Sequence, residues 1–198
     1  MLTAELKLTD SLFDEVEAKL EGLVSAYRTA ALPKASLDPV VLKQLGKDQT
    51  FLKKTCDSLR EQLLKLDTTH QHETTRLHLN FELLQQRLAH FDEALRISEV
   101  IKALNERLKA EIAEIREASI ALSKQILPYN LPKFEAGLEM FMDRCDQVAD
   151  QLDALENQSQ DIAPLMPLYE QWMFLVEQFG EILDERTEIL CPKEAQPA

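Results

Sequence analysis

A long stretch without proline restricts the possible folds of this chain more than any other feature of its sequence. Between Pro39 and Pro128 no proline occurs, and Gly46 is the only glycine. Proline breaks helices and glycine weakens them, so a stretch that lacks both favours long helices. The whole chain of 198 residues contains four glycines, which are few for a fold that depends on many tight turns. The sequence therefore predicts an all-α protein.

Three apolar seams follow one another inside this stretch. Within each seam, apolar residues recur at steps of three and four, the spacing that lines one side of a helix and forms a coiled-coil contact. This spacing predicts elongated coiled-coil helices over residues 39–127. The first seam comprises Leu52, Cys56, Leu59, Leu63 and Leu66, the second Leu77, Phe81, Leu84, Leu88, Phe91 and Leu95, and the third Ile101, Leu104, Leu108, Ile112 and Ile115.

A polar segment separates the first two seams. Residues 67–76 contain no apolar side chain, so a helix through them would have little to pack against. The sequence leaves two possibilities open: a bend or break at residues 67–76, or one continuous helix. A continuous helix from Val40 to Leu127 would be about 130 Å long at about 1.5 Å per residue.

A separate helix is expected before Pro39. Ser11 fits a helix start, because a hydroxyl there can accept hydrogen bonds from free backbone N–H groups, and apolar residues follow it at helical spacing. Pro33 interrupts that pattern, and Asp38 followed by Pro39 is typical of the next helix start. Residues 1–38 are thus expected to form an N-terminal helix and a proline-containing linker.

The segment Pro128–Pro132 marks the clearest boundary in the chain. A heptad run follows it, and a second helix is expected near Pro167, after a short polar link. Two such helices predict a C-terminal antiparallel hairpin over residues 128–190, and residues 191–198 are expected to be a disordered tail. The stripes of the two helices are Phe134, Leu138, Phe141, Cys145, Val148, Leu152 and Leu155, then Leu168, Trp172, Leu175, Phe179 and Ile182.

The formal net charge of −13 is concentrated in the predicted hairpin and the tail. Residues 1–127 carry 18 basic and 20 acidic side chains, whereas residues 128–198 carry 4 and 15. An acidic surface repels polyanions, so we expect no direct binding of nucleic acid or of an anionic membrane. The surface of a microtubule is also acidic, and any association with microtubules is therefore expected to be indirect.

Cysteine usage and hydropathy indicate the compartment. The three cysteines, Cys56, Cys145 and Cys191, lie far apart and cannot all pair within one chain, which is typical of a reducing environment. No apolar run approaches the roughly 18–20 residues that cross a bilayer. The N-terminus also lacks the pattern of a secretion signal. The sequence predicts a soluble, cytoplasmic protein.

Motifs for catalysis or metal binding are missing from the sequence. A di-iron four-helix bundle needs a glutamate three residues before a histidine, and none of the histidines, at positions 70, 72, 78 and 90, has one. Phosphate-binding glycine loops and the GxSxG and HExxH motifs are missing as well. Cys145 lies in a heptad seam beside acidic residues, which favours burial over thiolate chemistry. We expect no catalytic, cofactor-binding or metal-binding residue.

The apolar seams are the candidate functional residues. We expect them to pack with helices of partner subunits, so that an isolated monomer would expose long apolar stripes. Trp172 is a further candidate, because tryptophan is enriched at interface hot spots, with packing inside the hairpin as the alternative. The expected partner-packing residues are Leu77, Phe81, Leu84, Leu88, Phe91, Leu95, Ile101, Leu104, Leu108, Phe134, Leu138, Phe141, Val148, Leu152, Leu155 and Trp172.

One segment resembles a known family. Residues 99–126 are a repeat of Leu and Ile with Glu and Arg, and the sequence LPYNLPKFEAGLEMFMDRCDQVADQLDALE follows them. With this long helix, Asn-Leu-Pro pause and second helix, residues 95–156 resemble the family of second subunits of the augmin (HAUS) complex, which recruits γ-tubulin to existing spindle microtubules for branching nucleation. The resemblance implies a non-catalytic subunit of a hetero-oligomer of coiled-coil proteins at the spindle or centrosome, with microtubules and γ-tubulin as indirect partners.

Other functions stay open at this point. Residues 38–45 are similar to a small subunit of the spindle and kinetochore-associated complex, so a kinetochore or membrane-tethering subunit is one alternative. A self-associating coiled coil that needs no other subunit is a second. A compact four-helix metal-binding protein is a third.

Overall fold

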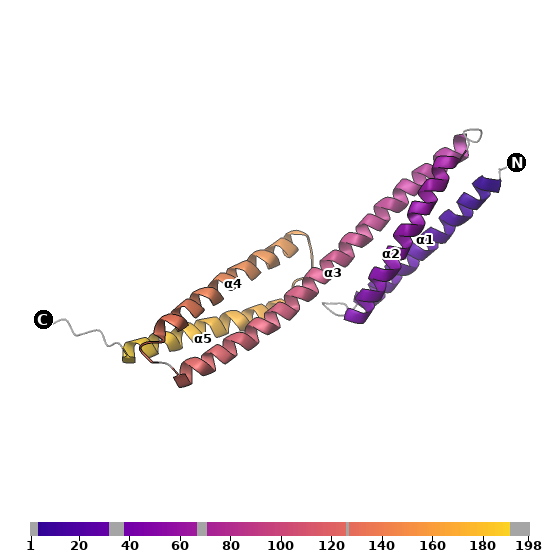
Figure 1. Ribbon diagram of the computed structural model, residues 1–198. Helices are drawn as coiled ribbons and strands as arrows, with labels where there is room; N and C mark the ends of the chain where they lie inside the picture. Colours follow the sequence, from indigo (N-terminus) through magenta and orange to yellow (C-terminus); the bar gives the residue numbers. More distant parts are fainter. Residues whose placement is uncertain (1–3, 32–37, 67–70, 126, 191–198) are drawn as a thin grey trace. The chain divides into compact units, whose positions relative to one another are not determined.

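The computed structural model describes residues 4–31, 38–66, 71–125 and 127–190, and these residues form five α-helices and no β-strand (Figure 1). The predicted all-α class is confirmed. The tail expected to be disordered, residues 191–198, lies outside the described residues. The helices are α1 (Ala4–Ala31), α2 (Pro39–Lys65), α3 (Gln71–Gln125), α4 (Leu131–Asn157) and α5 (Met166–Leu190).

The chain divides into two compact units, residues 1–102 and residues 103–198. Helices α1 and α2 belong to the first unit, and α4 and α5 to the second. Helix α3 continues without interruption from one unit into the other, so the boundary lies inside a helix. No proline or glycine marks this boundary in the sequence.

Helix α1 begins at Ala4, earlier than the predicted start at Ser11. That prediction is wrong, because the buried stripe extends further toward the N-terminus than the apolar pattern suggests. Leu6 and Thr9 are both buried and lie on the same side of the helix as Phe13. Ser11 therefore lies inside the helix and does not cap its end.

Helix α2 begins as the sequence predicts. The side chain of Asp38 accepts a hydrogen bond of 2.7 Å from the backbone N–H of Val40, and Pro39 occupies the first turn. The helix ends at Lys65, after which Leu66 has extended backbone angles. Helix α3 begins at Gln71 and runs in the direction opposite to α2 (Figure 1). One continuous helix through both segments is therefore excluded.

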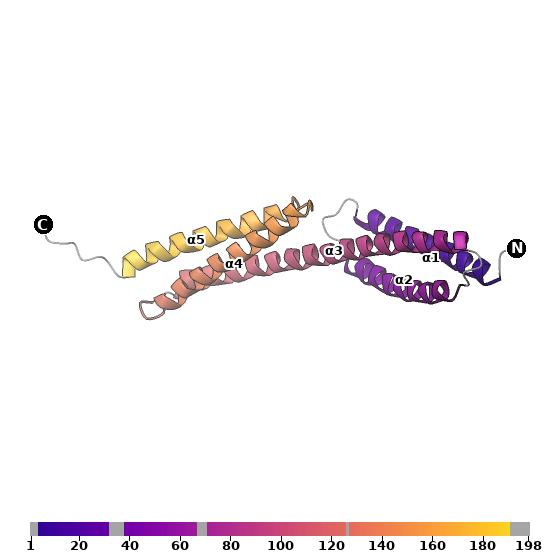
Figure 2. The same ribbon diagram turned by 90° about the horizontal axis from the view of Figure 1, so that it is seen from above.

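The first unit is a bundle of α1, α2 and the first part of α3 (Figure 2). Tyr27 of α1 packs edge-on against Phe91 of α3, with ring centroids 5.8 Å apart. Lys53 of α2 forms an ion pair of 2.5 Å with Asp92 of α3. The core cluster consists of Leu6, Phe13, Val16, Leu20, Leu23, Leu42, Leu45, Leu52, Cys56, Leu59, Leu63, Leu77, Phe81, Leu84, Leu88, Phe91 and Leu95.

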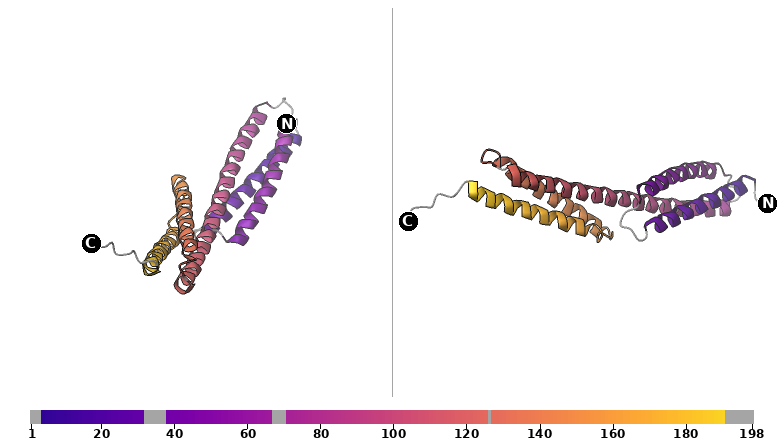
Figure 3. Two further views of the ribbon diagram at one scale, coloured as in Figure 1. Left: turned by 60° about the vertical axis from the view of Figure 1, so that its left-hand side comes forward. Right: turned by 90° about the horizontal axis from the view of Figure 1, so that it is seen from below.

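The second unit is a bundle of the rest of α3, α4 and α5 (Figure 3). Phe179 of α5 has its ring centroid 5.9 Å from that of Phe141 and 6.5 Å from that of Phe134, both on α4. A Cβ atom placed on Gly180 would lie 3.5 Å from the side chain of Leu138, an ordinary van der Waals distance, so α5 packs beside α4 at this position. Trp172 of α5 is completely buried.

One buried carboxylate connects α3 to α4 in the second unit. Glu111 is 7% exposed and accepts a hydrogen bond of 3.0 Å from Arg144, which also donates to Glu114 at 2.7 Å. A buried charge destabilises a protein unless it is paired, so Arg144 offsets the desolvation of Glu111. The hydrogen bonds to Glu114 and Glu111 raise the pKa of Arg144 above its usual value, and the guanidinium stays charged.

Replacing Arg144 by methionine is expected to lower the free energy of unfolding by about 2 kcal/mol, since hydrogen bonds to charged groups contribute about 1.5–3 kcal/mol. Glu111 would keep only a longer contact with Arg107, at 3.7 Å. Urea unfolding followed by circular dichroism measures the loss. The double variant Arg144→Met/Glu111→Met should recover most of it, because no buried charge remains unpaired. A single variant as stable as the natural chain would contradict this account.

Candidate docking groove between α1 and α2

The residues predicted to pack against partner subunits lie in the cores of the protein's own bundles. Helices of the same chain cover these seams, so the long exposed stripes expected of a monomer are not found at these positions. Heptad spacing identifies the buried face of a helix but not the chain that covers it, and a role toward a partner stays a prediction. Phe134 and Leu138 are half-buried, and the buried residues are Leu77, Phe81, Leu84, Leu88, Phe91, Leu95, Ile101, Leu104, Leu108, Phe141, Val148, Leu152, Leu155 and Trp172.

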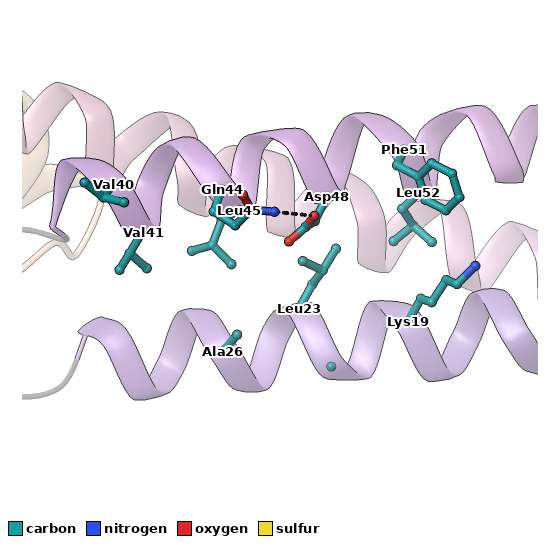
Figure 4. Close-up of a pocket in the computed structure, with 11 residues that line it drawn as sticks. Lys19, Leu23, Ala26, Val40, Val41, Gln44, Leu45, Asp48, Phe51 and Leu52 are labelled. Carbon is teal, nitrogen blue, oxygen red and sulfur yellow. Dashed lines mark hydrogen bonds between the residues drawn. The ribbon is translucent and has the colours of Figure 1, made fainter.

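Three large apolar side chains of α2 are exposed instead, those of Val40, Phe51 and Leu64. Val40 is 77% exposed and Phe51 is 58% exposed. A single exposed apolar residue is common on protein surfaces. Val40 and Phe51, however, line the same groove between α1 and α2, which has a volume of about 700 Å³ (Figure 4). The groove is therefore the strongest candidate for a binding surface in the first unit.

Each helix contributes one wall of the groove. The wall on α1 is low, because Gly22 and Ala26 carry little or no side chain. A Cβ atom placed on Gly22 would meet no atom within 4 Å, so the space beside it is open. The wall on α2 is apolar and includes Val40 and Phe51, and buried leucines of both helices lie between the two walls (Figure 4).

The polar groups of the groove have partners within the chain. The Nζ atom of Lys19 lies 4.9 Å from the centroid of the Phe51 ring and 2.6 Å from the carboxylate of Glu15. Gln44 donates a hydrogen bond of 2.9 Å to Asp48, the dashed line in Figure 4. Since these groups already have partners, the groove mainly offers its apolar surface.

The face of α2 beside the groove is basic. Lys43, Lys47 and Lys54 are exposed and lie three or four residues from Val40 or Phe51, which makes them neighbours on the helix surface. None of the three forms an ion pair with a residue in the described ranges. This side of the groove therefore carries unpaired positive charge.

No family model, curated protein or solved structure matches this chain. The function of the groove must therefore follow from its shape, its apolar lining and the charges beside it.

The groove offers binding contacts more than reactive groups. Its described lining contains neither histidine nor cysteine, and no three His, Cys, Asp or Glu side chains gather into a metal-binding group in the described part of the chain. Cys145 is buried elsewhere, and burial, with Asp146 and Glu111 nearby, raises its pKa to about 11, so the thiol is neutral at physiological pH. None of the helices in the described ranges is long and apolar enough to cross a membrane.

The apolar seams do not reveal this groove. Val40 and Phe51 lie off the seam that α2 buries, and an exposed valine or phenylalanine alone predicts nothing. A weak signal exists on α1, where Gly22 and Ala26 are four residues apart and so share one side of the helix. The small residues of α1 and the exposed apolar residues of α2 line one groove only because α2 folds back along α1.

Proposed function

We propose that the protein is a non-catalytic scaffold subunit that binds an amphipathic helix of a partner subunit in the groove between α1 and α2. The observation that carries this proposal is the exposure of Val40 and Phe51 on an open apolar groove. Clustered apolar surface of this kind marks interaction sites. A trough between two helices fits a third helix lying along it, and Gly22 and Ala26 allow the backbone of that helix to come close.

The charges beside the groove define the partner further. Lys43, Lys47 and Lys54 flank the apolar wall and form no ion pair with another described residue. A partner helix with glutamate or aspartate next to its apolar stripe would pair with them, and such complementarity favours correct orientation and fast association. The expected occupant is therefore an amphipathic helix with an apolar stripe flanked by carboxylates.

The coiled-coil character of the helices belongs to the same proposal. The spacing of three and four along the seams is that of knobs-into-holes packing. We propose that the long helices form coiled coils and that α4 and α5 form a C-terminal antiparallel hairpin. The contacts of Phe179 with Phe134 and Phe141 support the hairpin.

Among multiprotein assemblies, we propose an augmin-like complex. The resemblance over residues 95–156, with its Asn-Leu-Pro pause between two helices, supports this choice. The protein would then be one of several coiled-coil subunits at the mitotic spindle or centrosome and would support microtubule nucleation from existing microtubules. Because the net charge is −13, contacts with microtubules and γ-tubulin would be made through other subunits.

Affinity purification of the tagged full chain from mitotic cell extract, followed by mass spectrometry, tests both the scaffold function and the assignment to an augmin-like complex. We expect a stoichiometric set of other coiled-coil proteins together with γ-tubulin. Recovery of the chain alone, as a monomer or homo-oligomer, would overturn the scaffold function. A stoichiometric set of helical proteins without γ-tubulin would overturn the augmin assignment and leave the scaffold function in place.

A further inference from the structure

A second concave surface lies in the second unit, at the turn between α4 and α5. It has a volume of about 470 Å³ and is lined by residues of both helices and of the turn. Its lining includes the apolar side chains of Leu152, Ile162 and Met166. It shares no residue with the groove between α1 and α2.

Local hydrogen bonds hold the turn that shapes this pocket. Ser159 has a φ angle of 58°, in the left-handed region, and the N–H of Gln160 donates to the carbonyl of Leu155 at 3.0 Å, which ends α4. Asp161 accepts a hydrogen bond of 3.1 Å from the N–H of Ala163. The pocket is therefore preformed, and preorganisation lowers the entropic cost of binding.

Three carboxylates also line the pocket. Asp153 and Glu156 come from α4, and Asp161 comes from the turn. The side chains of Asp153 and Glu156 form neither ion pairs nor hydrogen bonds with residues in the part of the chain that the structure describes. The surroundings reinforce this negative charge, because residues 131–190 contain 3 basic and 14 acidic side chains.

Tyr169 adds an aromatic wall to the pocket. Burial raises the pKa of Tyr169, and the neighbouring Cys145, Asp146 and Asp153 raise it further, so the phenol is neutral at physiological pH. An aromatic face beside carboxylates attracts cations, and most strongly a guanidinium group that can stack on the ring. A lining of apolar, acidic and aromatic side chains fits a cation on an aliphatic stem.

We propose that this pocket binds an arginine side chain on a basic segment of a partner protein. The aliphatic stem of the arginine covers Leu152, Ile162 and Met166, and the guanidinium group pairs with Asp153 and Glu156. The site is independent of the groove between α1 and α2, which fits a helix flanked by carboxylates. The two surfaces therefore select segments of opposite charge.

Trp172 provides a local readout of binding. It is the only tryptophan of the chain, and its ring lies edge-on to that of Tyr169, with centroids 6.5 Å apart. The full chain is titrated with a synthetic amphipathic peptide of leucine and arginine, about 18 residues long so that it can form a helix. We expect a saturable change in tryptophan fluorescence and a weaker affinity as the salt concentration rises. A peptide with glutamate in place of arginine fits the groove between α1 and α2 but not this pocket, and should therefore leave the fluorescence of Trp172 in the second unit unchanged.

Two matched double variants distinguish binding by the carboxylates of the pocket from attraction by the overall negative charge of the second unit. Asp153→Asn/Glu156→Gln is expected to weaken binding of the arginine peptide by about ten-fold or more. Glu139→Gln/Asp143→Asn removes the same charge from exposed positions of α4 outside the pocket, and should change the affinity by less than about two-fold. Equal losses in both pairs would overturn the proposal. So would the lack of saturable binding, or binding of spermine as tight as that of the peptide.

Discussion

Replacement of Trp172 by alanine is expected to lower the free energy of unfolding by about 3–5 kcal/mol. The side chain is completely buried in the second unit. Its removal takes a large apolar surface out of the core and leaves a cavity that the helices can close only in part. Urea unfolding followed by far-ultraviolet circular dichroism measures the loss as a shift of the transition midpoint.

Two further variants separate loss of packing from other effects of the substitution. Trp172→Phe keeps most of the ring and removes an indole N–H that has no hydrogen-bond partner in the described residues, so the loss is expected to be much smaller. Phe174→Ala changes a side chain of the same helix that is 56% exposed, and should alter stability by less than about 0.5 kcal/mol. Equal effects of Trp172→Ala and Phe174→Ala would contradict the described core.

Filling the groove is expected to have the largest effect on partner binding. In Gly22→Trp, the indole would occupy the open space beside α1 where the partner helix is proposed to lie. We expect the affinity for the partner to fall by about 30-fold or more, which corresponds to about 2 kcal/mol at an interface hot spot. The fold should survive, because replacing a glycine inside a helix by tryptophan stabilises that helix by about a few tenths of a kcal/mol.

Gly46→Trp is the matched control for this variant. Gly46 also lies inside a helix of the first unit and has no atom within 4 Å of a Cβ placed on it, but it does not line the groove. Quantitative recovery of partner subunits with the natural chain and with both variants measures the difference. Unchanged recovery with Gly22→Trp, or equal losses with both variants, would refute docking in the groove.

Much of the local structure could be predicted from the sequence, because helix formation and the position of a buried stripe depend on residues close together in the chain. Asp38 and Pro39 predict the start of α2, and the capping hydrogen bond to Val40 is found there. The seam from Leu77 to Leu95 predicts the face that α3 buries. The start of α1 was harder to place, because a polar residue, Thr9, continues its buried stripe.

The tertiary arrangement and the candidate sites depend on residues that are distant in sequence. A heptad seam fits a helix of the same chain as well as one of another chain, so it cannot predict that α2 folds back along α1. The groove needs small residues on one helix and exposed apolar residues on the other, and neither set forms a pattern by itself. The pocket near Tyr169 depends on a turn at Ser159, a non-glycine residue in a left-handed conformation that sequence patterns rarely indicate.

The uninterrupted passage of α3 from the first unit into the second affects how this chain can be divided. Multidomain chains are usually separated in a flexible linker, where a cut leaves both domains intact. Here a cut between Lys102 and Ala103 falls inside a helix, and it would leave several backbone N–H and C=O groups without partners at the new ends. Neither unit can therefore be removed or exchanged by itself. Because both units contain part of α3, a cut at their boundary breaks the helix that they share.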